Sequence, residues 1–320
     1  MNRKLGRSGI EVSSIGLGCW AIGGVYWRSE TDPSGWGEVD DDESIRAIRR
    51  AIDLGITFFD TADVYGAGHS EEVLGHALIG KRDEVTIATK FGRVFDSEKR
   101  MILGSDVSPE HMRRACEESL RRLRTDHIDL YQLHVGDADA GDAEILMEEL
   151  EKLVETGKIR FYGWSTDDPE RAALFAKGPH CTAIQQHFNV FGGSDETLAL
   201  CERENLASIN RGPLGQGILT GKFSSDTVFD KATVRGGWDM KSGPQAVLLR
   251  KFEAIRGAMT SDDRTPAEGA LGWLLARSPN MIPIPGFKTV QQVEQNAGAL
   301  LYGILTRDQM REIDEIMAGM

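Results

Sequence analysis

The sequence predicts an α/β fold in which the whole chain, residues 1–320, forms a single (β/α)8 barrel of the TIM type. Short apolar segments of strand-like composition alternate with segments whose apolar residues recur at helical spacing. No stretch between them has the composition of a linker, so a division into two domains is not expected. A doubly wound open sheet is the structural alternative that the same alternation allows.

The expected strands are short and mostly apolar. Ile128–Leu133 is a nearly unbroken apolar run, which is typical of parallel strands that helices cover on both faces. The eight strand candidates comprise residues 15–17, 57–60, 85–89, 128–133, 159–165, 183–187, 207–211 and 281–284.

Capping residues mark the helices between these strands. Asp41 and Asp42 stand before an amphipathic stretch that stops at Gly55, and a glycine is a common helix end. Ser108 precedes a proline and combines an N-cap with a proline in the first helical position, while Ser70 is a further candidate cap. Later helices are expected at about residues 109–123, 143–156, 169–176, 195–204 and 290–299.

Three segments do not fit a minimal barrel. Residues 3–12 predict a short hairpin ahead of the first barrel strand. The glycine-rich residues 222–243 are too long for an ordinary connection and form a candidate lid. Residues 307–317 predict an additional helix near the C-terminus.

Composition and charge narrow the functional classes. The net charge of −13 disfavours binding to nucleic acid or to an anionic membrane surface, since both require a basic face. No apolar run approaches the length of a membrane span, and residues 1–6 lack the apolar stretch of a signal peptide. The four cysteines are far apart and form no CxxC motif, which favours a reducing cytoplasm over a disulfide framework or structural zinc. We therefore expect a cytoplasmic protein without a metal site.

Polar residues stand at the carboxyl ends of the expected strands, where the active sites of such barrels lie. Asp60, Lys90 and His134 end three successive strands, a concentration that a purely structural barrel does not require. The residues in these end positions are Asp60, Lys90, His134, Ser165, Gln185 and Arg211.

Tyr65, in the turn after Asp60, is a candidate proton donor. A free tyrosine has a pKa of about 10, and a nearby cation such as Lys90 would stabilise the phenolate and lower that pKa. Asp60 would keep Lys90 charged, while His134 would donate to a substrate oxygen or share a proton with the tyrosine. This group suits protonation of a carbonyl oxygen or deprotonation of an alcohol. Because no side chain supplies hydride, a nicotinamide cofactor is implied.

Three segments resemble the catalytic motifs of the aldo-keto reductase superfamily. They are GITFFDTADVYG at residues 55–66, TIATKFG at residues 86–92 and DLYQLH at residues 129–134, and the similarity extends over nearly the whole chain. The resemblance implies a (β/α)8 barrel that binds NADP(H) without a Rossmann fold. It also implies a catalytic tetrad with a tyrosine as the acid/base, formed by Asp60, Tyr65, Lys90 and His134.

The resemblance further assigns residues to the nicotinamide and the pyrophosphate. Gln185 and Ser165 take the positions of residues that bind the nicotinamide amide, while Thr166 departs from the asparagine of the family motif. Arg211 stands where many relatives have a tyrosine, and a guanidinium plane is able to stack on the nicotinamide ring. The segment GPLGQG at residues 212–217 resembles the loop beside the pyrophosphate. Additional cofactor contacts are expected from Leu214, Gln216 and Lys222.

The eighth strand is followed by a helix whose N-terminus is a candidate phosphate site. Free N–H groups and the helix dipole favour an anion there, and Lys288 adds a full positive charge. By resemblance, the residues that would hold the 2′-phosphate and the adenine end of the cofactor are Lys288, Thr289, Gln292, Gln295 and Asn296. A local cation in an acidic protein favours NADP(H) over NAD(H).

The expected function is reduction of a small aldehyde or ketone to an alcohol, or the reverse, by hydride transfer with NADP(H). Trp20, Trp27 and Trp238 fall in loops at the open end of the barrel and are candidate substrate contacts. A nucleotide-sensing regulatory subunit of the same fold is the alternative, since such proteins are able to keep the tetrad. A metal-dependent barrel hydrolase is more distant, because the histidines show no metal-ligand spacing. Neither the substrate nor the oligomeric state follows from the sequence.

Overall fold

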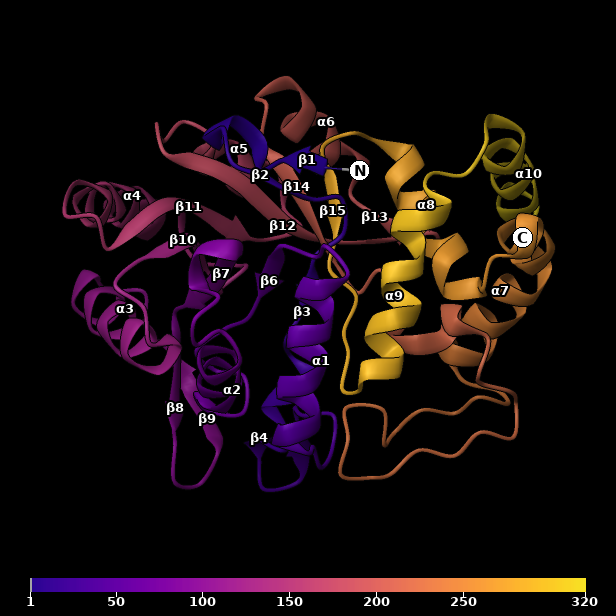
Figure 1. Ribbon diagram of the computed structural model, residues 1–320, viewed down its shortest axis with the longest axis horizontal. Helices are drawn as coiled ribbons and strands as arrows, with labels where there is room; N and C mark the ends of the chain where they lie inside the picture. Colours follow the sequence, from indigo (N-terminus) through magenta and orange to yellow (C-terminus); the bar gives the residue numbers. More distant parts are fainter. Residues whose placement is uncertain (1) are drawn as a thin grey trace.

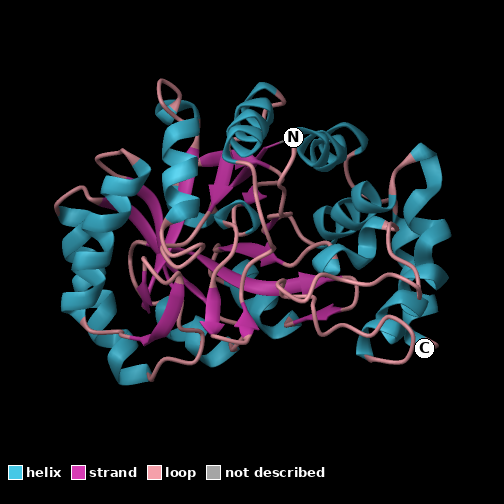
Figure 2. Ribbon diagram, turned by 90° about the horizontal axis from the view of Figure 1, so that it is seen from below, coloured by secondary structure: helices cyan, strands magenta, loops and turns pink. Residues whose placement is uncertain are grey.

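The computed structural model describes residues 2–320 and confirms the expected barrel, a ring of parallel strands with helices outside it (Figure 1; Figure 2). Neighbouring strands follow the order β15-β14-β12-β11-β10-β7-β6-β3. The ring closes where the Gly16 N–H donates to Pro283 O at 2.9 Å and the Gly18 N–H donates to Pro285 O at 3.0 Å. This closure excludes the open doubly wound sheet. The barrel strands are β3 (Leu17–Gly18), β6 (Phe58–Asp60), β7 (Thr86–Phe91), β10 (Ile128–Leu133), β11 (Ile159–Ser165), β12 (Cys181–Asn189), β14 (Ala207–Arg211) and β15 (Met281–Pro283).

Each barrel strand is followed by at least one outer helix. The Asp40 carboxylate, one residue earlier than expected, caps α1 by accepting from the Glu43 N–H at 3.0 Å. Ser108 caps α3 as predicted, whereas Ser70 lies inside α2 and instead donates to Cys19 O at 2.7 Å. The helices that surround the barrel are α1 (Asp41–Asp53), α2 (His69–Ala77), α3 (Pro109–Leu123), α4 (Ala140–Glu155), α5 (Pro169–Phe175), α6 (Asp195–Arg203), α8 (Pro266–Arg277) and α9 (Val290–Tyr302).

Two further helices lie beside this ring. The predicted C-terminal helix is α10 (Arg307–Ala318), and it packs against α7 (Pro244–Thr260), which the sequence reading missed together with α8. Signals for the two missed helices were present, because a proline occupies the first turn of each and Thr265 with Glu268 forms a capping box before α8. In Figure 1, α7 and α10 stand at one side of the barrel, away from α3 and α4.

The predicted N-terminal hairpin closes one end of the barrel. It consists of β1 (Asn2–Lys4) and β2 (Glu11–Ser13), and its Leu5 and Val12 pack with interior side chains such as Phe58. Apolar contact of this kind excludes water from that end. Figure 1 shows the hairpin at the edge opposite to β8 and β9, so access to the interior is from the carboxyl ends of the strands.

Two contacts fix the hairpin against the barrel wall. Gly6 has φ +54°, and a Cβ atom there would lie 2.1 Å from Thr182 O, so only glycine fits this approach of two backbones. The buried Arg3 guanidinium donates to Leu275 O at 2.6 Å and also to the carbonyls of Ser278 and Met281. The first residues of the chain are thereby tied to the strand that closes the ring.

A small four-stranded sheet beside the carboxyl ends was not predicted. It pairs β4 (Trp27–Ser29) and β5 (Asp32–Pro33) with the hairpin of β8 (Arg93–Asp96) and β9 (Met101–Ser105). These segments are short and distant in sequence, and their pairing therefore leaves little local signal. The sheet extends the wall of the barrel above β7.

Residues 222–243 form an irregular segment across the same end of the barrel, with no helix or strand between η4 (Gly215–Thr220) and α7. The Val234 N–H donates to Gly35 O at 3.0 Å, so the segment contacts the connection that follows β3. A position over the open end is consistent with the predicted lid.

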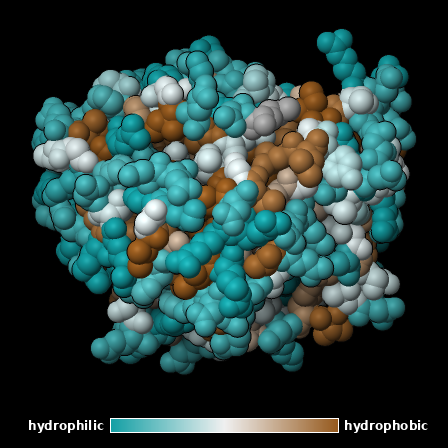
Figure 3. All heavy atoms as spheres, in the orientation of Figure 1, coloured by the Kyte–Doolittle hydropathy of each residue, from teal (hydrophilic) through white to brown (hydrophobic). Residues whose placement is uncertain are grey.

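The outer surface is mainly hydrophilic on the face drawn in Figure 3, with separate apolar patches. Large exposed apolar side chains are few, and Leu301 on α9 is among them. Within residues 2–320, no helix combines the length and the apolar character that crossing a membrane would require.

The close approach at Gly6 yields a stability prediction. Gly6→Ala combines a positive φ with overlap against a backbone carbonyl, and should lower the free energy of unfolding by about 2–5 kcal/mol. Gly9→Ala is the matched control, because Gly9 has φ +79° but no atom within 4 Å of its Cβ position. That variant should lose only about 1 kcal/mol. Urea unfolding measures both, and equal losses would contradict the packing argument.

Candidate active site

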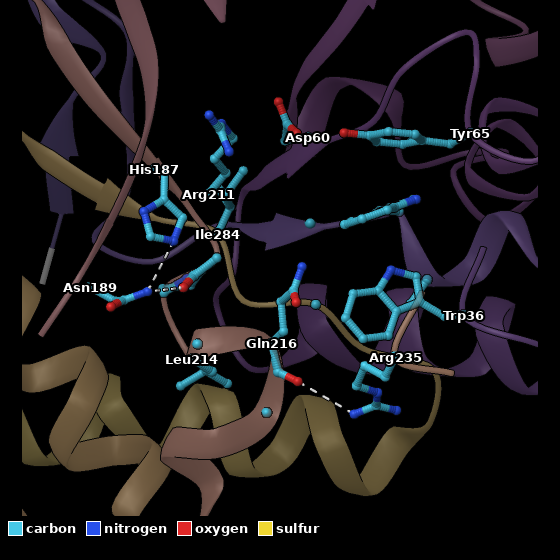
Figure 4. A pocket seen from close by; sticks show the side chains of 18 of the residues that line it. Trp36, Asp60, Tyr65, His187, Asn189, Arg211, Leu214, Gln216, Arg235 and Ile284 are labelled. Carbon is cyan, nitrogen blue, oxygen red and sulfur yellow. Dashed lines mark hydrogen bonds between the residues drawn. The ribbon is translucent and has the colours of Figure 1, made fainter. Parts of the chain in front are cut away.

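A cavity of about 1410 Å³ lies at the carboxyl ends of the barrel strands. Its walls carry polar side chains from β6, β12 and β14 together with residues of the segments that follow β3 and β14 (Figure 4). The sequence-predicted site residues that line it are Trp20, Asp60, Tyr65, His134, Ser165, Gln185, Arg211, Leu214, Gln216, Lys222, Trp238, Lys288, Gln292, Gln295 and Asn296.

A buried ion pair forms the floor of this cavity. The Lys90 ammonium donates to Asp60 Oδ1 at 2.5 Å and to Thr61 O at 2.8 Å, and both charged side chains are almost fully buried, at 0% and 2% exposure. The second carboxylate oxygen, Asp60 Oδ2, accepts from Gln132 Nε2 at 3.0 Å and from Gln185 Nε2 at 2.7 Å. Every charge in this group therefore has hydrogen-bonding partners, as burial requires.

Tyr65 stands directly over the ammonium. Its hydroxyl oxygen lies 3.3 Å from Lys90 Nζ, and its ring is stacked beside Trp20 with a centroid distance of 6.0 Å. Figure 4 shows the hydroxyl pointing toward Asp60. Burial raises the pKa of Tyr65 well above its ordinary value, with the negative charge of Asp60 acting in the same direction.

This direction corrects the expectation that Lys90 lowers the pKa of Tyr65. The ammonium of Lys90 is paired with Asp60 at 2.5 Å, and the burial of Tyr65, followed by the negative charge of Asp60, determines the direction of its pKa. A raised pKa keeps the phenol protonated at neutral pH. Tyr65 is thus held in the form that is able to donate a proton.

His134 completes the arrangement. Its ring meets the Tyr65 ring edge-on, with centroids 5.7 Å apart. Burial lowers the pKa of His134 well below its ordinary value, and the nearby charges of Lys90, Arg93 and Arg211 add to that effect. Its Nδ1 atom is buried and has no hydrogen-bonding partner within residues 2–320. The imidazole itself lines the cavity, although this nitrogen is closed to solvent.

The predicted nicotinamide residues lie on adjacent strands. Ser165 ends β11, and Gln185 lies opposite it on β12; both border the cavity, although the Gln185 amide also binds Asp60. The Thr166 hydroxyl donates to Gly136 O at 2.8 Å, which turns it away from the cavity and accounts for its departure from the family motif. Ser165 and Gln185 are therefore the side chains that remain placed for this contact.

Arg211 is anchored by an ion pair that the sequence reading did not anticipate. Its guanidinium binds the Asp167 carboxylate, which also accepts from the His187 N–H at 2.6 Å. His187 and Asn189 line the cavity beside it, with Asn189 Nδ2 donating to Gly212 O at 2.9 Å (Figure 4). His187 is the last residue of the predicted strand 183–187 and Asn189 lies two residues past its end, and the sequence analysis singled out neither of them.

The region after β15 differs from the expected open phosphate site. The Val290 N–H donates to the Glu43 carboxylate at 2.9 Å, and the Gln292 N–H donates to the Thr289 hydroxyl at 3.3 Å. The expectation of free N–H groups here is wrong for these two residues. Thr289 is used as the N-cap of α9 and does not line the cavity.

Lys288 links this region to the segment after β3. Its ammonium donates to Trp36 O at 2.7 Å and to Glu38 O at 2.9 Å. Burial lowers the pKa of Lys288, followed by the positive charge of Arg235. The Arg235 guanidinium in turn lies over the rings of Trp36, Phe223 and Phe229, at 5.0, 5.2 and 4.9 Å from their centroids. Arg235 thus joins residues 222–243 to Trp36 in the segment after β3, and Lys288 joins the region after β15 to that same segment.

Two of the three tryptophans predicted to contact substrate line the cavity, and the third does not. Trp20 and Trp238 line the cavity, and Trp20 Nε1 donates to the Tyr26 hydroxyl at 2.7 Å. Trp27 does not line it, although its neighbours Tyr26 and Arg28 do, because successive strand residues face opposite sides. Of the three predicted tryptophans, Trp27 is thus the one outside the cavity wall. Tyr26 and Trp36, which the sequence reading did not single out, are wall residues instead.

The described residues also bear on metal and disulfide chemistry. Within residues 2–320, no three His, Cys, Asp or Glu side chains are grouped as a metal ion would require. Cys19, Cys116, Cys181 and Cys201 are buried free thiols.

Comparison with known proteins agrees with the geometry. The sequence model of the Aldo/keto reductase family matches residues 14–318. A probable aldo-keto reductase 1 of Glycine max is 35% identical over 321 residues, covering 98% of this chain and 87% of the relative. The structure of a glycerol dehydrogenase from Gluconobacter oxydans gives a TM-score of 0.85 at 33% identity, over 99% of this chain and 95% of that one. An aldo-keto reductase from Klebsiella pneumoniae in complex with NADPH gives 0.72 at 29% identity, over 99% and 96%.

The barrel and the matches together define a class of protein, the oxidoreductases built on a (β/α)8 barrel. The chain belongs to the aldo/keto reductase family, whose sequence model covers nearly its whole length. The name of one relative specifies glycerol dehydrogenase activity, but family membership alone does not define the substrate of this chain.

The buried ion pair leads to a prediction about stability. Lys90→Met leaves the Asp60 carboxylate buried without its cation, and should lower the free energy of unfolding by about 3–5 kcal/mol. The double variant Asp60→Asn with Lys90→Met removes both charges and should recover most of that loss. Denaturant unfolding of the single and double variants forms the test. Additive losses would show that the two charges do not stabilise each other.

Proposed function

We propose that this chain is an NADP(H)-dependent reductase that converts an aldehyde or ketone to an alcohol, and that it also catalyses the reverse oxidation. The observation that carries the proposal is the position of the Tyr65 hydroxyl, 3.3 Å from the ammonium of Lys90, with the His134 ring edge-on to the tyrosine ring. A hydroxyl so placed faces the cavity and is suited to meet a carbonyl oxygen.

The cavity has the donors that a phosphorylated nicotinamide cofactor requires. Besides His134 Nδ1, buried Trp36 Nε1 and Arg235 Nε also have no hydrogen-bonding partner within residues 2–320. Lys222, Arg235 and Lys288 supply positive charge in an acidic chain, and cations of this kind favour phosphate groups. Ser165 and Gln185 would hold the carboxamide, and Gln295 and Asn296 the adenine end.

When bound, NADPH supplies the hydride that adds to the carbonyl carbon. Tyr65 then donates its proton to the carbonyl oxygen, and the resulting phenolate is stabilised by the ammonium at 3.3 Å. Asp60 keeps that ammonium in place, while the neutral His134 hydrogen-bonds the substrate oxygen. In the reverse direction, Tyr65 accepts the proton of the alcohol. Because burial raises the pKa of Tyr65, reduction should persist to alkaline pH.

Tyr65→Phe tests the proton donor. The variant keeps the ring beside Trp20 and removes only the hydroxyl, so kcat should fall by about 10²–10⁴-fold. The assay uses 4-nitrobenzaldehyde with NADPH, and a tryptophan-fluorescence titration checks that the nucleotide still binds. Tyr131→Phe is the matched control, because its hydroxyl is buried on β10 and donates to Met112 O at 3.3 Å, outside the cavity. Near-normal kcat in Tyr65→Phe would refute the mechanism.

Wild-type binding of NADPH with no turnover of any carbonyl would instead favour the nucleotide-sensing alternative.

Lys288→Ala tests the cofactor preference. The 2′-phosphate distinguishes NADP(H) from NAD(H), and loss of a charge-assisted contact weakens binding by about 10- to 150-fold. Affinity for NADPH should fall by that factor, while affinity for NADH changes little. Lys241→Ala removes the same charge from an exposed lysine at the end of the lid segment and serves as control. Equal losses for both nucleotides would assign Lys288 to holding the segment at Trp36 and Glu38.

A further inference from the structure

The charges around the cavity are unbalanced. Asp60 is the one carboxylate among the described residues that line it, and Lys90 already neutralises that group. The remaining charged wall residues are all cations, in a chain whose net charge is −13. Concentration of one sign of charge in a cleft attracts ligands of the opposite sign. The cationic wall residues are Arg28, Arg93, Arg211, Lys222, Arg235 and Lys288.

These cations fall on two sides of the barrel. Arg211 and Lys222 belong to β14 and the segment after it, and Lys288 follows β15, so all three lie where the phosphorylated cofactor is proposed to bind. Arg93 follows β7, which is four strands away from β14 in the closed ring and therefore across the barrel from it. The cofactor accounts for the first group and leaves the second without a function.

The second group consists of Arg93 on β8 and Arg28 on β4, a strand that pairs with β9 of the same hairpin. Of these two residues, only Arg93 has an uncompensated charge. The Arg28 guanidinium lies 3.3 Å from the Asp32 carboxylate, and both side chains are exposed. The Arg93 guanidinium donates to the neutral Ser105 hydroxyl at 2.8 Å, and no carboxylate of residues 2–320 lies within 4.0 Å of it. Arg93 lines the same cavity as Tyr65 and His134, the residues of the proposed reaction centre.

The wall next to Arg93 is apolar. Ile102 and Leu103 on the paired strand β9 line the same cavity, and Leu103 is exposed at 63% although it is a large apolar residue. Trp20 and Tyr26 face them from the segment after β3. An apolar surface with one guanidinium beside it suits a molecule that has a hydrocarbon body and an anionic end.

We propose that Arg93 is a substrate-binding residue that selects carbonyl compounds carrying a carboxylate or phosphate group. The proposal rests on the reductase function proposed above and names the substrate class of that same site. The guanidinium fork matches the oxygen geometry of both anions. The substrate carbonyl lies at Tyr65 and His134, and its anionic group extends toward β8.

The test compares charged and neutral aldehydes of similar size. For the wild type, kcat/KM should be higher for 4-carboxybenzaldehyde than for 4-nitrobenzaldehyde. Arg93→Met should lower kcat/KM for the carboxylate substrate by about 10- to 150-fold and leave the nitro substrate nearly unchanged. Arg93→Lys should retain part of the preference. A parallel pair, glyceraldehyde 3-phosphate against glyceraldehyde, determines whether the preferred anion is a phosphate.

Lys99→Met is the matched control. Lys99 lies on the same β8–β9 hairpin, is 73% exposed and is outside the cavity wall, so its removal changes the charge of the hairpin but not the site. Higher ionic strength should lower kcat/KM of the wild type for the charged aldehydes more than that of Arg93→Met. Losses in Arg93→Met that are equal for charged and neutral aldehydes, or no loss for either, would overturn the proposal.

A binding measurement separates this proposal from the reductase function. Benzoate and benzamide are titrated into NADP⁺-saturated wild type and Arg93→Met by calorimetry. Tighter binding of benzoate than of benzamide, lost in the variant, supports the anion site even if no aldehyde is turned over. Equal binding of the two probes would overturn it even if the wild type proves to be a reductase.

Discussion

The structure depends on a lysine and an aspartate that are buried together at one end of a barrel. An isolated charge in such a place would be strongly destabilising, and a pair is tolerated only when its remaining hydrogen-bonding capacity is satisfied. Lys90 on β7 and Asp60 on β6 meet this condition with amide donors from β10 and β12, through Gln132 and Gln185. The strands β6, β7, β10 and β12 must therefore bring these four side chains to the same height along the barrel axis, and all four must point into the barrel. The closed ring supplies that alignment, and an open sheet would leave β12 too far from β6.

The same pair determines the state of its neighbours. Burial, together with the negative charge of Asp60 beside Tyr65 and the positive charge of Lys90 beside His134, favours the neutral form of both side chains. A neutral phenol and a neutral imidazole are the forms needed to receive a carbonyl oxygen. In the proposed reaction, the ammonium would stabilise the phenolate that Tyr65 becomes when it donates its proton. Preorganised charge of this kind stabilises the product of proton transfer without weakening the acid beforehand.

The sequence predicted the alternating strands and helices of the barrel and the residues that stand at the ends of its strands. The strand ends at Asp60, Lys90 and His134 were found because a parallel barrel gathers such ends, and the hairpin that carries Leu5 was found from its own pattern. Contacts between irregular segments that are distant in sequence could not be predicted, because no regular pattern places such segments together. Trp36, the sheet of β4 and β9, and the carbonyl partners of Lys288 arise from chain paths that no local pattern encodes. The raised pKa of Tyr65 was missed for a related reason, since it depends on burial.

The tie between the first residues and the last barrel strand has a consequence for how the chain folds. Arg3 binds the carbonyl of Leu275, 272 residues later, and the ring itself closes between Gly16 and Pro283. During synthesis, Arg3 must wait until almost the whole chain has left the ribosome before its carbonyl partners exist. Closing so long a loop carries an entropic cost that local helices do not share, and contacts of such separation are typical of slow folding. The apolar partners of Leu5 and Val12 are made throughout synthesis, from Phe58 to Ile284, so the cover of the hairpin is complete only when the ring closes.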